Sequence, residues 1–178
     1  MSIKLGIRVD LSQLKRMAAK HKAAVPKAIG RALNKTVDKT ATAAAREISA
    51  ATKIPVREVR KRLIVRRASS THLLASIEAL AYSPNLKKFR PTQNKRGVAA
   101  TAWEGRKTYK GAFVNPKTGS VVTRTTDKRF PLKGLRGPSV RSTFVQDRII
   151  AKLNAVAEQS WRTNIDHELA RELKKALA

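Results

Sequence analysis

The chain has 178 residues, a length that suits one domain, and its 39 Lys and Arg outnumber 12 Asp and Glu, for a net charge of +27. It has no cysteine, which excludes disulfides and thiolate metal sites. The N-terminus lacks the apolar core of a signal peptide, and no apolar run of about 18 residues occurs. We therefore expect a protein that is soluble and intracellular at synthesis, with no membrane partner.

The excess positive charge is the strongest signal in the composition. A free monomer with this charge repels itself, so we expect an anionic partner or an assembly to offset the repulsion. A sequence-independent nucleic-acid-binding protein fits this composition, and so does a structural subunit that accommodates DNA. Charge alone does not distinguish the two classes.

The N-terminal part is predicted to be a strand followed by helices. Residues Ile3–Val9 alternate between apolar and other side chains, the period of a half-buried strand. A first helix is expected over Leu11–Ala24, with Asp10 or Ser12 as its cap. Pro26 separates this helix from the next, because the residue before a proline avoids the α region.

A long helix predicted for Pro26–Lys53 organises the chain. Its apolar and small side chains recur at steps of three and four: Ile29, Leu33, Val37, Thr40, Ala44, Ile48 and Ala51. Pro26 fits the first turn, where its missing N–H costs nothing. The stripe is thin, so we expect the helix to gain most of its stability from neighbouring elements.

A shorter helix is predicted for Val56–Ile64, within a basic segment. Residues 53–67 hold seven Lys or Arg and one acid, and the candidates for contact with nucleic acid or an acidic partner are Arg57, Arg60, Lys61, Arg62, Arg66 and Arg67. Two helices around a turn raise the alternative of a helix-turn-helix motif. The second helix, however, offers charge without the Asn, Gln, Ser or Thr that would read base edges. A basic face in solvent, or turned to a partner's acids, is the favoured interpretation.

The middle of the chain is predicted to be β-rich and basic. Residues His72–Ser83 alternate with apolar side chains on both faces, which indicates a strand covered on at least one of them. The segment 84–136 has fourteen Lys or Arg and two acids. Short strands are predicted in it at 98–103, 111–114 and 120–125.

Two loops of this segment carry further predictions. The turn sequence 115–119 predicts that 112–114 and 121–123 form a hairpin. The loop Leu86–Val98 places five positive charges around one phenylalanine, and we expect it to be disordered until a partner orders it. Its candidate contact residues are Lys87, Lys88, Arg90, Lys95 and Arg96.

From Val140 the chain is predicted to be helical to its end, as a packing element. Its apolar residues form two stripes: Val145, Ile149, Leu153 and Val156, then Trp161, Ile165, Leu169, Leu173 and Leu177. The predicted fold class is α+β, with long N-terminal helices, a small, mostly antiparallel sheet with basic loops, and a long C-terminal helix. We expect a single domain over 1–178, with parts 1–68, 72–136 and 140–178.

The sequence offers no pattern typical of catalysis. His21, His72 and His167 have no carboxylate or second histidine at ligand spacing. The glycines match neither the Walker A nor the dinucleotide pattern, and Ser139 lacks the glycine that a nucleophile elbow needs after it. Carboxylates are too few for a two-metal nuclease. We expect no enzyme and no metal, cofactor or small-molecule ligand.

Several motifs occur in a characteristic order: AVPKAIGRALNKTVDKTATAAAREI, IPVREVRKRL, GAFV and RFPLKGLRGPSV, followed by a long C-terminal helix. In this order they resemble the prophage minor tail protein Z family over residues 20–178. The most specific positions are Gly111, Phe113, Phe130, Pro131, Gly137 and Pro138. Residues 82–110 match least, so the role of their basic loop does not follow from the resemblance.

The resemblance implies a virion structural protein of long-tailed phages, assembled in the host bacterial cytoplasm. It implies action in tail completion at the head-proximal end, as a homo-oligomeric ring, typically of six subunits, around the DNA channel. Its partners would be other tail and neck proteins and DNA bound without sequence preference. The motif residues would be scaffold or interface positions. The alternative hypothesis is a free, sequence-independent nucleic-acid-binding protein, which steeply salt-dependent binding by a monomer or dimer would favour.

Overall fold

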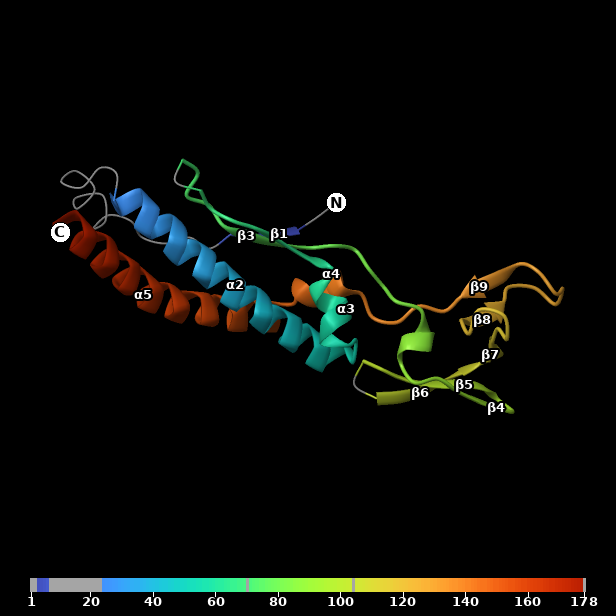
Figure 1. Ribbon diagram of the computed structural model, residues 1–178. Helices are drawn as coiled ribbons and strands as arrows, with labels where there is room; N and C mark the ends of the chain where they lie inside the picture. Colours follow the sequence, from blue (N-terminus) through green and yellow to red (C-terminus); the bar gives the residue numbers. More distant parts are fainter. Residues whose placement is uncertain (1–2, 7–23, 70, 104, 178) are drawn as a thin grey trace.

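A computed structural model describes residues 3–6, 24–69, 71–103 and 105–177 of the chain (Figure 1). The molecule is elongated. Two long helices and a small sheet form one end, which we call the helical end (residues 24–79 and 140–177). Strands and loops form the other, the β-rich end (residues 84–136). The predicted α+β class is confirmed.

The long helix predicted at the start of the chain is α2, which spans Ala24–Thr52. One broad face is buried, with residues at steps of three and four: Val25, Ala28, Ile29, Ala32, Leu33, Val37, Ala41, Ala44, Ala45 and Ile48. Pro26 lies in the first turn, as predicted. The helix ends at Lys53, whose N–H donates to the Ser49 carbonyl (2.8 Å) and whose φ of 60° turns the chain out of the helix.

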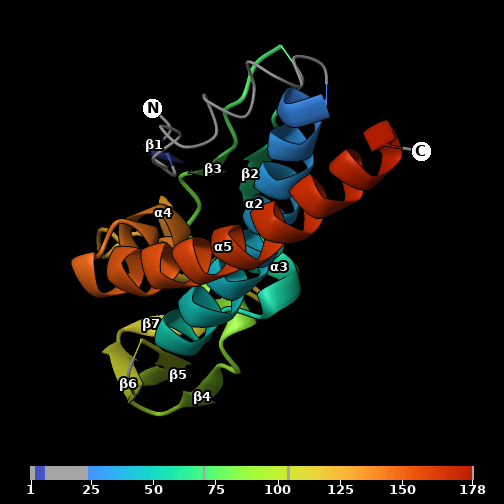
Figure 2. The same cartoon turned by 90° about the vertical axis from the view of Figure 1, so that its left-hand side faces the viewer.

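A second long helix, α5 (Asp147–Leu177), packs against α2, and the two cross at an angle in Figure 2. The buried face consists of Ile149, Leu153, Ala157, Ser160, Trp161, Ile165 and Glu168. The prediction of a packing helix is confirmed, with one break. The short helix α4 (Val140–Phe144) begins at the Ser139 cap and ends before α5. The side chains of Leu173 and Leu177 lie outside the described part of the structure.

A carboxylate is buried where α2 and α5 meet. Glu168 is fully buried and accepts a hydrogen bond from Lys35 Nζ (2.5 Å), while Arg171 Nη1 lies 3.9 Å from its second oxygen. The Lys35 hydrogen bond lowers the pKa of Glu168 against the opposing effect of burial. Arg31 and Glu172 form a second ion pair between these helices.

Acid is therefore expected to weaken this helix pair. Because the folded pKa of Glu168 lies below the unfolded value of about 4.3, the ionised carboxylate stabilises the fold above that pH. That contribution is lost as the pH falls through the folded pKa.

Thermal melts at pH 7 and pH 3 should show a lower Tm at pH 7 for Glu168→Gln than for wild type, and a smaller drop in Tm on acidification. Glu158→Gln, at an exposed position of α5, is the control and should change stability by less than about 0.5 kcal/mol. Equal acid sensitivity of wild type and Glu168→Gln would contradict the prediction.

A three-stranded antiparallel sheet covers part of the helical end. Its order is β1 (Ile3–Gly6), β3 (Ser76–Ala79) and β2 (Leu63–Arg66), with β3 in the middle and buried on both faces. The predicted strands at 3–9 and 72–83 are confirmed over these shorter spans, and residues 7–9 lie outside the described part. The helix expected over Leu11–Ala24 also falls outside it up to residue 23.

The helix predicted for Val56–Ile64 is wrong in its second half. The helix α3 covers only Val56–Arg60, and the chain then enters β2, where Leu63 pairs with Ala79 and Val65 with Ile77. Pairing with the buried strand β3 overrides the helical spacing of the apolar residues, and β-branched Ile64 and Val65 suit a strand. This geometry also removes the helix-turn-helix alternative, because α3, the helix that follows α2, has only five residues and leads directly into β2.

The β-rich end contains two further three-stranded antiparallel sheets (Figure 1). One has the order β4 (Thr92–Asn94), β5 (Gly97–Ala102) and β6 (Gly105–Lys110), and the other β7 (Ala112–Val114), β8 (Val121–Arg124) and β9 (Leu132–Gly134). The predicted hairpin of 112–114 with 121–123 is confirmed. Strands β4, β6 and β9 were not predicted.

The loop Leu86–Val98 is ordered, contrary to the expectation of disorder. A single turn of 3₁₀ helix, η1 (Leu86–Lys88), buries Leu86, and the next residue, Phe89, is buried as well. Thr101 N–H of β5 donates to the Phe89 carbonyl (3.0 Å). Two buried side chains anchor this basic loop within its own chain, so it needs no partner to order it.

Candidate nucleic-acid and partner interface

Most of the arginines predicted for partner contact in 57–67 have partners in their own chain. Arg66 Nε donates to the buried carboxylate of Glu78 (2.6 Å), and this hydrogen bond raises the pKa of the Arg66 guanidinium. Arg67 Nη2 donates to both oxygens of Asp38 (3.0 Å each). These two side chains hold β2 to β3 and to α2, which gives them a structural role.

The remaining side chains of this cluster differ in whether they contact other residues of the chain. Arg60 donates to the Thr42 hydroxyl (2.8 Å). The Arg62 guanidinium stacks 4.0 Å from the centre of the Tyr82 ring, with its Nε buried. Arg57 and Lys61 are exposed and have no ion pair among the described residues. In the described part, acids of the chain thus neutralise Arg66 and Arg67, Arg60 and Arg62 contact neutral groups, and Arg57 and Lys61 have no side-chain partner.

The second predicted segment, 86–96, is freer. Lys87, Arg90, Lys95 and Arg96 are exposed, with no ion pair to any described residue. Lys88 Nζ lies 3.8 Å from Glu58 Oε1 of α3. This contact brings the two predicted segments together where the helical and β-rich ends join.

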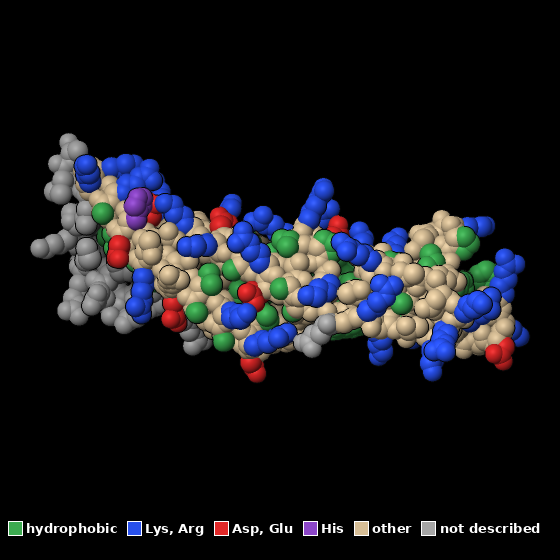
Figure 3. All heavy atoms as spheres, turned by 90° about the horizontal axis from the view of Figure 1, so that it is seen from below, with side chains coloured by type: hydrophobic (Ala, Val, Ile, Leu, Met, Phe, Trp, Pro, Cys, Tyr) green, Lys and Arg blue, Asp and Glu red, His purple; other side chains and the backbone are tan. Residues whose placement is uncertain are grey.

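Both ends carry excess positive charge, nineteen Lys or Arg against nine acids at the helical end, but the ion pairs of the described residues lie almost entirely at the helical end. Acids of the helical end pair with neighbouring bases: Glu47 with Lys152, Asp38 with Arg67, Glu78 with Arg66, Glu168 with Lys35 and Glu172 with Arg31. The β-rich end has fourteen Lys or Arg against two acids. Among its described residues, Lys88 alone forms an ion pair. On the face in Figure 3, lysine and arginine side chains spread over this end while acidic side chains are sparse.

Sequence reasoning missed the basic strand β6. Arg106, Lys107 and Lys110 are exposed on this edge strand of the β4–β5–β6 sheet. Glycines bound the segment GRKTYK, and its Thr and Tyr have high strand propensity. One residue separates it from the predicted strand 98–103, a connection short enough to indicate a hairpin.

The sequence profile of the family described as Prophage minor tail protein Z (GPZ) matches residues 5–178. The chain belongs to this family. The resemblance inferred from the motifs is thereby confirmed over nearly the whole chain. No curated protein and no solved structure matches the chain. As a minor tail protein of a phage or prophage, it is a virion component that works among other tail proteins.

The motif residues of this minor tail protein lie mainly where the chain turns. Gly111 joins β6 to β7 with φ of 68°. Phe113 is half-buried, and the Arg124 guanidinium lies 5.4 Å from the centre of its ring. An added Cβ at Gly137 would lie 2.4 Å from the Phe89 ring, and Pro138 is buried beside it. Gly137 and Pro138 thus fix the passage from the β-rich end into α4.

Phe130 differs from the other motif residues. Its side chain is 63% exposed, and the peptide bond to Pro131 is cis. The Arg129 guanidinium lies 5.7 Å from the ring centre. The structure therefore places Phe130 at the surface, where another protein can reach it.

The described residues of the minor tail protein contain no group of three or more His, Asp or Glu arranged to hold a metal ion. None of the helices within the described ranges is long and apolar enough to cross a membrane.

The two tryptophans provide a check on the arrangement of the ends. Trp103 is 46% exposed, whereas Trp161 is 7% exposed between α5 and α2. Trp161→Phe should leave a red-shifted emission that acrylamide quenches readily. Trp103→Phe should leave a blue-shifted emission that is protected from the quencher. Similar quenching of the two variants would contradict the packing of α5 on α2.

Proposed function

We propose that this minor tail protein completes the phage tail at its head-proximal end, as a ring of subunits, six in the simplest case, around the DNA channel. It acts as a non-enzymatic structural part. It is assembled in the host cytoplasm and contacts other tail and neck proteins. Family membership supports the virion role, and the charge distribution supports the position next to DNA.

The uncompensated charge of the β-rich end carries the proposal. Lysine and arginine side chains that have no acid of their own chain are available to phosphate groups. The free cations lie on loops and an edge strand, without a protruding recognition element. Such a surface binds phosphates without reading sequence, as a channel for the whole genome requires.

A ring also accounts for the charge. If the β-rich ends of several subunits face one lumen, they repel one another unless an anion lies between them. Duplex DNA, with one charge per about 1.7 Å of its axis, supplies that anion. Subunit contacts would in turn bury exposed apolar side chains such as Val56, Ile64 and Phe130.

The proposed DNA-contacting residues follow from exposure and freedom from internal partners. From the sequence-based set we retain Arg57, Lys61, Lys87, Arg90, Lys95 and Arg96, and we add Lys110 of β6. Arg60, Arg62, Arg66 and Arg67 act as internal ties, and Lys88 joins η1 to α3.

Electron microscopy of an induced lysate from a prophage that lacks only this gene tests the function. We expect malformed tails, unjoined heads and tails, or particles of normal appearance that fail to infect. A plasmid copy of the gene should restore infectivity. Normal infectious particles without the gene would overturn the tail proposal and favour a free, sequence-independent nucleic-acid-binding protein.

A further inference from the structure

Three non-glycine residues with positive φ lie where the helical and β-rich ends join. Among the described residues these are Lys53 (φ 60°), Arg90 (49°) and Trp103 (56°). L-amino acids rarely adopt this conformation, and such outliers cluster at functional sites. Lys53 has a local reason, since a left-handed residue commonly ends a helix. Trp103 has none.

Trp103 occupies an unfavourable backbone position. It is the first of two residues that connect β5 to β6, whose last pair is Ala102 with Gly105. Two-residue hairpin connections with positive φ favour Asn or Gly, and a bulky aromatic residue costs stability there. With Trp103 46% exposed, burial within the chain offsets only part of this strain.

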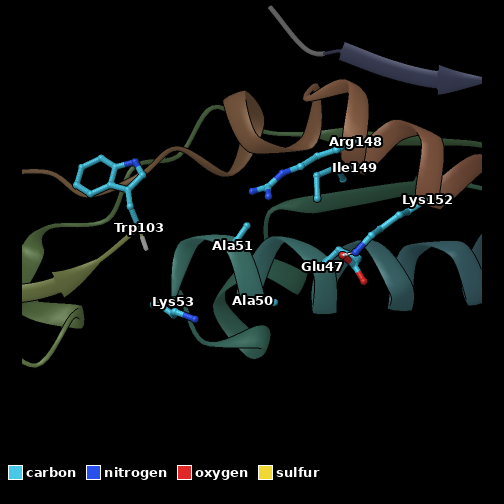
Figure 4. A pocket seen from close by; sticks show the side chains of 8 residues that line it. All are labelled: Glu47, Ala50, Ala51, Lys53, Trp103, Arg148, Ile149 and Lys152. Carbon is cyan, nitrogen blue, oxygen red and sulfur yellow. Dashed lines mark hydrogen bonds and ion pairs between the residues drawn. The ribbon is translucent and has the colours of Figure 1, made fainter. Parts of the chain in front are cut away.

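The Trp103 ring stands between two hollows. The first, of about 260 Å³, lies against the end of α2 and the start of α5 and is lined by Glu47, Ala50, Ala51, Lys53, Trp103, Arg148, Ile149 and Lys152 (Figure 4). The second, of about 600 Å³, lies along β6 and is lined by Ala102, Trp103, Gly105, Arg106, Lys107 and Tyr109. Among the described residues, Trp103 is the one that the linings of these two hollows share.

Apolar side chains line both hollows, and cations surround them. Ala50, Ala51 and Ile149 line the first hollow, and the Tyr109 hydroxyl is buried beside the second with no hydrogen-bond partner among the described residues. Glu47 is the one acid among the described lining residues, and Lys152 Nζ binds it (2.8 Å). Lys53, Arg106, Lys107 and Arg148 have no ion pair in the described part. Glu104, which follows Trp103, lies outside that part.

We propose that Trp103 and the two hollows form a docking site for an acidic segment of another virion protein, which places an apolar side chain against the indole ring. The surrounding cations match acidic side chains, and the apolar lining of the hollows matches the apolar side chain of the segment. A duplex DNA backbone suits this surface less well, because it has no apolar group to fill the hollows. Tryptophan, tyrosine and arginine are also the side chains most enriched at binding hot spots.

This inference rests on the proposed role in the tail, and its test uses tails that lack the protein. Tails purified from the gene-deleted prophage are incubated with purified full-length protein, and the bound fraction is measured by sedimentation. Trp103→Ala is expected to weaken binding at least about tenfold, the effect of removing a hot-spot side chain. Leu74→Ala, which truncates an exposed apolar residue far along the chain, is the matched control and should bind like wild type.

A charge variant keeps the test decisive if Trp103→Ala fails to fold. Arg106→Glu with Lys107→Glu changes exposed side chains beside the ring and should also weaken binding to tails. Lys174→Glu with Lys175→Glu, which makes the same charge change at the end of α5, should not. Circular dichroism melts confirm that each variant is folded.

The outcomes separate the docking site from the proposed function. Wild-type protein that does not bind these tails would remove the tail-completion role and the docking site together. Wild-type binding with equal binding by Trp103→Ala and by the charge variant would overturn the docking site alone. Loss of duplex DNA binding in Trp103→Ala, with tail binding intact, would make the surface part of the DNA contact and would also overturn the proposal.

Discussion

Replacing Gly97 with alanine is expected to disrupt the β5–β6 hairpin. Gly97 has φ of 142°, and an added Cβ would lie 2.1 Å from the Tyr109 carbonyl oxygen, a backbone atom of the partner strand. The substitution combines backbone strain with a clash that no side-chain rotation relieves. We expect the free energy of unfolding to fall by about 2–4 kcal/mol. In a chain of this size, that corresponds to a Tm lower by about 5–15 °C.

Gly105→Ala is the matched control for this hairpin. Gly105 begins β6 at the other end of the hairpin, has no positive φ and has no atom within 4 Å of an added Cβ. Its Tm should therefore stay close to the wild-type value, with a change below about 0.5 kcal/mol. Calorimetric or circular dichroism melts measure both variants. Equal Tm values for Gly97→Ala and Gly105→Ala would show that β5 and β6 are not paired in this register.

Neutralising four cations of the β-rich end is expected to remove most of the DNA affinity. In the variant Lys87→Gln, Lys95→Gln, Arg96→Gln and Lys110→Gln, each lost phosphate contact reduces the steepness of the decline of log K with log salt by about one. The slope should become shallower by about four. At 0.1 M salt the affinity for a duplex of mixed sequence should fall by up to about a thousandfold. Fluorescence anisotropy over a salt series measures the slope.

A variant of the helical end provides the control for net charge. Lys27→Gln, Lys39→Gln, Arg46→Gln and Lys175→Gln remove the same charge from exposed positions without ion pairs in the described part. The salt slope of this control should change by less than one. If both variants lose the same slope, the charge acts diffusely over the whole chain, and the assignment of DNA contact to the β-rich end fails.

Elements with a regular pattern of their own could be predicted from the sequence. The helix α2 follows from apolar residues at steps of three and four after Pro26, and the β7–β8 hairpin from the turn signal at 115–119. Strand β3 alternates in the expected way and is the centre of its sheet. In each case a local period or a local turn identifies the element before its distant contacts are known.

The errors arose where distant contacts determine the structure. Leu63–Arg66 has helical spacing with Val56 and Val59, yet it pairs with β3, a strand that follows it only after residue 75. The loop 86–98 was predicted to be disordered because of its five positive charges. Burial of Leu86 and Phe89 against other elements, with Gly137 beside the Phe89 ring, anchors it. No single segment of the sequence reveals these partners.

The candidate contact residues could be predicted only as a class. The sequence shows that Arg66 and Arg67 are charged, but their partners, Glu78 and Asp38, lie in other elements. Their internal hydrogen bonds make them structural, while the free cations of β6 went unnoticed because the strand itself was not predicted. A basic residue becomes a functional candidate once the fold shows that no acid of the same chain neutralises it.

The most direct test of the central claim is a cryo-electron microscopy reconstruction of the particle at the junction of head and tail. We predict density for the paired helices α2 and α5 in a ring at the head-proximal end of the tail, with the β-rich end of each subunit toward the DNA. Density for the protein at the distal end of the tail, or β-rich ends that point away from the channel, would contradict the account.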